Sequence, residues 1–99
     1  MRISDSEHTK IVALAKRHFG QNAVVRLFGS RTDDGRIGGD IDLHIQADSS
    51  DLAILANELE FAVGLKDLIG DQKIDVIVRG PGHSHRGIDD VAVRTGIVL

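Results

Sequence analysis

The sequence contains no cysteine, tryptophan or tyrosine, and only one proline among its 99 residues. Without cysteine the chain forms neither disulfide bonds nor thiolate metal sites. Its aromatic residues are three phenylalanines, so a core has to be built from Ile, Leu, Val and Ala. No apolar stretch reaches the roughly 18 residues of a membrane span, and no signal-peptide pattern is present. We therefore expect a cytoplasmic protein with no membrane association.

The charge balance and the length limit the class of protein and the number of domains. Twelve basic and fifteen acidic residues give a net charge of −3, which argues against general nucleic-acid binding through phosphate contacts. A chain of 99 residues is the size of one domain, and its 41% hydrophobic content is enough for a core. We expect residues 1–99 to form a single domain.

The hydrophobic pattern predicts an alternation of helices and strands. Ser4 with Glu7 three residues later is a capping box, and Gly20 marks the end of the helix that follows. Apolar residues recur at helical spacing in three segments, alternate in two others and form one short, nearly continuous run at 24–28. We predict helices at about 5–19, 52–69 and 88–95, strands at about 23–28, 40–47 and 73–78, and an apolar tail at 97–99. The predicted fold is α/β, a small mixed sheet of three or four strands covered mainly on one face by helices.

The strand expected at 40–47 carries two acids on one face. Strict alternation places Asp40, Asp42 and His44 on the face opposite Ile41 and Leu43. Two carboxylates two residues apart on a strand repel each other unless a cation lies between them. Mg²⁺ is commonly held by one or two carboxylates together with substrate phosphates. Asp40 and Asp42 are therefore candidate metal ligands, whereas His44 receives no role.

A glycine turn precedes this strand. Gly29 and Ser30 end the first apolar run, and such a turn offers backbone N–H groups and a hydroxyl to a phosphate. Arg31 follows directly and is either a phosphate clamp or a solvated loop residue. Asp33 and Asp34 fit an ordinary polar turn better than extra metal ligation.

The two elements together resemble the motif of the DNA polymerase β-like nucleotidyltransferases. That motif is an apolar residue, Gly and Ser or Gly, a spacer, and then two acids alternating with apolar residues. The match here is Phe28-Gly29-Ser30, nine intervening residues, and Asp40-Ile41-Asp42-Leu43. The chain looks most like the small stand-alone group, the minimal nucleotidyltransferases paired with HEPN proteins. The resemblance is strongest over residues 24–45.

The resemblance also implies a third carboxylate on the next long strand. In the strand expected at 73–78, Ile74, Val76 and Val78 face the core and Asp75 points the other way. If this strand pairs beside the preceding one, Asp75 joins Asp40 and Asp42. The alternative is a solvent-facing acid that protects a sheet edge. We favour the catalytic interpretation because Asp is depleted in strands.

By resemblance, the site holds an NTP, with ATP favoured, and two Mg²⁺ ions, with Mn²⁺ also suitable. Asp40, Asp42 and Asp75 would be catalytic and metal-binding, and Gly29, Ser30 and Arg31 would bind the nucleotide. The implied activity is protein AMPylation: transfer of AMP to a hydroxyl, a tyrosine of a HEPN-type toxin, with this chain acting as antitoxin. The alternative is an inactive antitoxin that neutralises its partner by direct contact. Base and acceptor selection require a partner or a second copy, because the chain has no room for a second domain.

Two features outside the motif invite other interpretations. His83-Ser84-His85 has the spacing of metal ligands, but a polar loop explains it better. The apolar tail at 97–99 and a helix stripe of Ile54, Phe61 and Leu65 serve either as a docking surface or as core. An EF-hand loop and a P-loop both fail on spacing.

Overall fold

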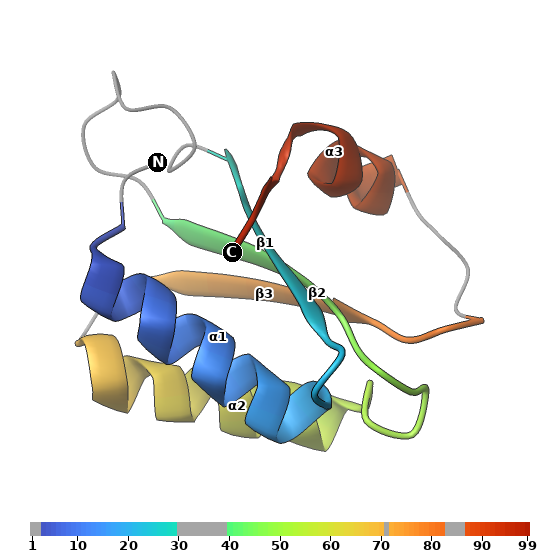
Figure 1. The fold of residues 1–99 in the computed structure, drawn as a ribbon, viewed down its shortest axis with the longest axis horizontal. Coiled ribbons are helices and arrows are strands. Elements are labelled where there is room, and N and C mark those ends of the chain that lie inside the picture. The colour runs from blue at the N-terminus through green and yellow to red at the C-terminus, as the bar shows by residue number, and fades with distance from the viewer. Residues whose placement is uncertain (1–2, 30–39, 71, 83–86) are drawn as a thin grey trace.

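The computed structural model describes residues 3–29, 40–70, 72–82 and 87–99. Three helices and four strands make up these residues, as Figure 1 shows. In chain order they are α1 (Asp5–Phe19), β1 (Val24–Phe28), β2 (Ile41–Gln46), α2 (Leu55–Ile69), β3 (Ile74–Arg79), α3 (Gly87–Thr95) and β4 (Ile97–Val98). The predicted α/β fold class is confirmed. Among the described residues, no helix combines the length and the apolar character needed to cross a membrane.

The four strands form one mixed sheet in the order β3-β2-β1-β4. β1 runs antiparallel to both β2 and β4, whereas β2 and β3 are parallel. The fourth strand is the segment that the sequence presents as an apolar tail. Its pairing with β1 is extended by a hydrogen bond from the Leu99 N–H to the carbonyl of Val25, 2.9 Å long. Part of the tail therefore belongs to the sheet and forms one of its two edge strands.

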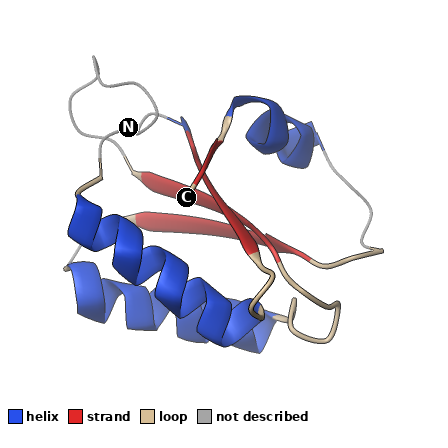
Figure 2. Ribbon diagram, viewed as in Figure 1, coloured by secondary structure: helices blue, strands red, loops and turns tan. Residues whose placement is uncertain are grey.

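The hydrophobic core lies between the sheet and the helices α1 and α2, which run side by side (Figure 2). Ile41, Leu43 and Ile45 of β2 face this core and are fully buried, as predicted, but the half-buried character expected of the strand does not hold throughout, because His44 on the other face is also fully buried. Phe19 of α1 and Phe61 of α2 pack with ring centroids 5.5 Å apart. Phe61 and Leu65 are wholly buried, so their proposed docking role is wrong; Ile54 is about half exposed.

α1 and α2 differ in how well the sequence predicts where they begin. α1 has the predicted capping box: the Ser4 N–H donates to Glu7 and the Glu7 N–H donates to the Ser4 hydroxyl. α2 begins at Leu55 rather than 52, and no side chain caps it. The preceding residues form tight turns instead, in which the N–H groups of Leu52 and Ala53 donate to carbonyls three residues back.

α3 covers part of the other face of the sheet, as its position on the far side from α1 and α2 in Figure 1 shows. Only Asp89 and Ala92 of this helix are buried. The face that carries the predicted carboxylates is therefore partly covered, and this helix packs against it through a polar residue.

Candidate active site

Asp42 and Asp75 are direct neighbours in the sheet. The parallel register of β2 and β3 pairs Asp42 with Asp75, and the antiparallel register of β1 and β2 places Phe28 on the other side of Asp42. The two acid-bearing strands therefore do lie side by side, which was the condition for Asp75 to join the other acids. Paired residues in neighbouring strands project on the same face, so the two acids share the face opposite the helical core.

The surroundings of Asp42 disfavour its charged form. Burial raises the pKa of the Asp42 carboxyl above its ordinary value, and the negative charges of Asp75 and Asp40 and a hydrogen bond with Asp75 raise it further. The nearby Lys73 lowers the pKa of Asp42, but less than the other groups raise it. Phe28, only 8% exposed, lies beside Asp42 and contributes to this burial. Carboxylates crowded in this way typically occur where a cation or a proton is held.

Asp40 lies just before β2 and pairs with a cation. Its Oδ2 atom is 3.4 Å from Nζ of Lys73, and the two side chains are 41% and 70% exposed. An ion pair this exposed is weak and is screened by salt. Among the described residues, no three His, Cys, Asp or Glu side chains stand close enough together to hold a metal ion as placed. Asp42 and Asp75 thus form the close pair, with Asp40 beside them.

The conformation of Gly29 explains why glycine stands there. Its φ of +76° is unfavourable for any residue with a side chain, and a Cβ atom would lie 2.3 Å from Oδ2 of Asp42. The turn that ends β1 therefore approaches the candidate carboxylate closely. Ser30, Arg31, Asp33, Asp34 and His83-Ser84-His85 lie outside the described residues.

The donor set of this site suits a hard divalent cation. Asp42 and Asp75 supply carboxylate oxygens from adjacent strands, and Asp40 lies just before β2 with its carboxylate paired to Lys73 rather than grouped with the other two. Such oxygen ligands are those preferred by Mg²⁺ and Mn²⁺. The raised pKa of Asp42 agrees with this choice of ligand. Repulsion from Asp75 and Asp40 contributes to the raised pKa, and a bound cation would offset that repulsion.

Sequence reasoning missed one buried polar cluster on this face. His44 and Asp89 are both fully buried, and Nε2 of His44 is 2.8 Å from Oδ1 of Asp89. Arg79 donates to the other carboxylate oxygen of Asp89 through Nε, at 3.1 Å. In the sequence, the only local indication of this cluster was the position of His44 on the carboxylate face. Asp89 gave no indication, because an acid in the first turn of a helix is usually exposed and stabilises the helix through its dipole.

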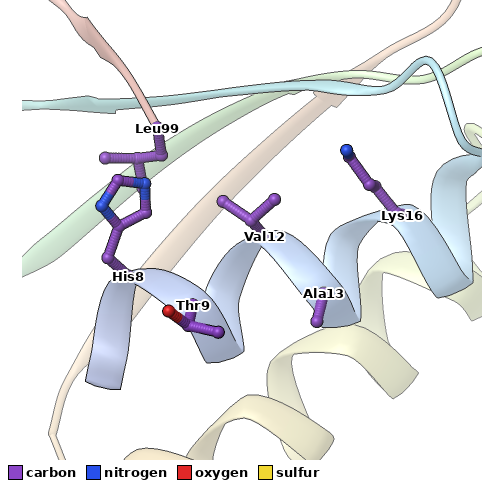
Figure 3. A pocket seen from close by; sticks show the side chains of 6 residues that line it. All are labelled: His8, Thr9, Val12, Ala13, Lys16 and Leu99. Carbon is purple, nitrogen blue, oxygen red and sulfur yellow. The ribbon is translucent and has the colours of Figure 1, made fainter. Parts of the chain in front are cut away.

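A separate hollow lies away from the carboxylates. Residues of α1 and the end of the chain line an open groove of about 440 Å³. In Figure 3, His8, Val12 and Lys16 extend along one side of the helix, with Leu99 close to His8. None of the predicted site residues lines this groove.

Comparisons of the chain with models of protein families, with curated proteins and with solved structures found no match.

Proposed function

We propose that this chain is a metal-dependent nucleotidyltransferase that transfers AMP from ATP to a hydroxyl group. The observation that carries the proposal is the register that makes Asp42 and Asp75 neighbours, beside a turn at Gly29 whose backbone approaches the Asp42 carboxylate closely at a positive φ. The backbone at Gly29 is accessible to a phosphate, and the neighbouring carboxylates of Asp42 and Asp75 suit a cation. The resemblance of the motif supplies the reaction class.

In this proposal Asp40 and Asp42 share one role and Asp75 has another. Asp40 and Asp42 would hold both divalent ions, and Asp75 would hold the ion that activates the incoming hydroxyl. The bound ions would supply charge neutralisation for the triphosphate and for the attacking oxygen. Gly29 lets the chain approach the phosphates, while Ser30 and Arg31 remain the predicted phosphate contacts. The acceptor oxygen forms a bond to the α-phosphorus, the bond to pyrophosphate breaks, and the hydroxyl proton passes to solvent.

The proposed acceptor is a tyrosine of a HEPN-type toxin, which would make this chain a cytoplasmic antitoxin. Its net charge of −3 disfavours an RNA acceptor, and it contains no tyrosine that could be modified in its place.

The experiment combines the protein with labelled ATP, Mg²⁺ and, as the candidate acceptor, the protein product of the adjacent gene. We expect a mass increase of one AMP on that partner, lost in Asp42→Asn and strongly reduced in Asp75→Asn. Asp67→Asn, which changes an exposed acid in α2, is the matched control and should transfer normally. If the Asp42→Asn variant still neutralises the toxicity of the partner while the mass of the partner is unchanged, this chain would instead be an antitoxin that acts by contact alone.

A further inference from the structure

The buried cluster on the carboxylate face links three elements through one side chain. Both carboxylate oxygens of Asp89 are engaged, Oδ1 by Nε2 of His44 on β2 and Oδ2 by Nε of Arg79 on β3. His44 and Asp89 have no exposed side-chain surface, and the Arg79 side chain is 17% exposed. The side chain of Asp89 therefore connects α3 to two parallel strands at once.

The same two strands carry the candidate carboxylates. On β2, His44 follows Asp42 by two residues and so projects on the same face. On β3, Arg79 follows Asp75 by four residues and shares that face for the same reason. The cluster therefore joins β2 to β3 on the face that carries the acids, with His44 one pleat beyond Asp42 and Arg79 two pleats beyond Asp75.

Apart from its contacts with Asp89, the cluster has one further side-chain hydrogen bond among the residues that the structure describes, from Nη1 of Arg79 to the carbonyl of Val78 at 2.9 Å. Nδ1 of His44 and Nη2 of Arg79 are buried and lack a hydrogen-bond partner within the described part of the chain. A buried donor that loses its acceptor bears the full cost of desolvation, and a buried cation that loses its anion bears more. Removing the negative charge of Asp89 would thus leave Arg79 uncompensated and force the cluster to rearrange.

Few apolar side chains of α3 are buried. Besides Asp89, only Ala92 of the helix is buried, whereas Ile88, Val91 and Val93 are 37 to 43% exposed. A rearrangement of the cluster therefore has two consequences. α3 packs less firmly on the sheet, and β2 and β3 lose the contact through Asp89 that joins them near Asp42 and Asp75.

We propose that Asp89 is a positioning residue of the candidate active site, acting through His44 and Arg79 to hold Asp42 and Asp75 in the spacing that binds a divalent cation. This inference rests on the proposed metal site and adds to it a residue outside the nucleotidyltransferase motif. Asp89 itself touches neither the cation nor the substrate.

The test compares Mn²⁺ affinity, measured by electron paramagnetic resonance of free and bound ion, across matched variants of the full chain. Asp89→Asn preserves shape but removes the charge; Asp90→Asn changes the adjacent exposed acid of the same helix and is the control. Groups that orient metal ligands typically contribute about 10- to 100-fold to metal affinity, and we expect a loss in that range for Asp89→Asn. Asp90→Asn should bind Mn²⁺ as the wild type does.

Leu65→Ala separates positioning from general destabilisation. Leu65 is fully buried in α2, on the helical side of the sheet. Its truncation should lower the melting temperature while leaving Mn²⁺ affinity unchanged in the folded protein. If Asp89→Asn does not fold, Arg79→Lys replaces it, because lysine keeps the charge but loses the Nε donor; a tenfold loss of affinity is again expected. In the same samples, the amide resonances of Asp42 and Asp75 should shift in Asp89→Asn and not in Leu65→Ala.

The outcomes distinguish this inference from the proposed function. Wild-type Mn²⁺ affinity in Asp89→Asn, or an equal loss in Leu65→Ala, overturns the positioning role while AMP transfer stands. Mn²⁺ binding that depends on Asp89, with no AMP transfer by the wild type, supports the positioning role and removes the transfer function. A wild-type chain that binds no Mn²⁺ overturns the positioning role.

Discussion

Asp42 and Asp75 stand opposite each other on neighbouring parallel strands, and this closeness helps raise the pKa of the Asp42 carboxyl. The arrangement opposes stability, since burial and like charges both disfavour the ionised form of Asp42. Such a cost to stability is expected at a site whose carboxylates bind a cation, because the bound cation would offset their repulsion.

The first prediction is that Asp42→Asn stabilises the fold at neutral pH. Above its raised pKa, Asp42 is charged in the folded protein at a cost that the unfolded chain does not bear. The gain should therefore be fully present above the folded pKa and should shrink as the pH falls through it toward 3.8, the ordinary value. Thermal melts followed by far-ultraviolet circular dichroism from pH 4 to pH 8 measure this difference. An Asp42→Asn protein that is less stable than the wild type at pH 8 would contradict the prediction.

The second prediction is that Mg²⁺ stabilises the wild-type chain and not Asp42→Asn. A ligand that binds only the folded state adds about 2.7 kcal/mol at a concentration 100 times its dissociation constant. Melting temperatures measured over a Mg²⁺ titration at constant ionic strength give the effect. Asp67→Asn is the control and should respond like the wild type. A Mg²⁺ response that is the same in Asp42→Asn and in the wild type would mean that the ion binds elsewhere.

Gly29→Ala should impair both the site and the fold. The added methyl group would meet Oδ2 of Asp42 at 2.3 Å, and φ at this position is +76°. A strained backbone of this kind costs about 1–3 kcal/mol, and relief of the collision requires Asp42 to move. We expect a loss of that size in urea unfolding together with weaker Mn²⁺ binding. Gly70→Ala provides the comparison, since φ there is +93° and a Cβ atom would meet nothing within 4 Å. If both variants bind Mn²⁺ equally well, the contact between Gly29 and Asp42 has no bearing on the site.

The fourth prediction concerns two leucines of α2. Leu65 is fully buried and Leu59 is 56% exposed. Leu65→Ala should lower the free energy of unfolding by about 2–5 kcal/mol through the lost contacts and the cavity. Leu59→Ala should change it by no more than about 0.5 kcal/mol. Urea unfolding followed by circular dichroism suits this chain, which has no tryptophan or tyrosine for fluorescence. Similar losses in the two variants would show that the exposed side of α2 is covered in solution.

The helices show where sequence patterns suffice and where they do not. The capping box of Ser4 and Glu7 is a local signal, and it fixes the start of α1 as predicted. The segment Asp48-Ser49-Ser50-Asp51 consists of residue types that commonly cap helices, yet α2 begins only at Leu55. Asp48 instead accepts hydrogen bonds from Asn22, a residue 26 positions away, so a distant contact overrides the local preference.

By itself, the sequence determined the alternation that separates Asp40, Asp42 and Asp75 from the core, because strand periodicity depends only on consecutive residues. It also determined the glycine at position 29, without showing what that glycine contacts. Only the tertiary structure decided that β3 pairs with β2 in the register that makes Asp42 and Asp75 neighbours. It likewise decided that Asp89 is buried against His44, 45 residues away, rather than exposed on a helix. Strand pairing and helix docking join residues far apart in the chain, and their energies depend on contacts that no local pattern contains.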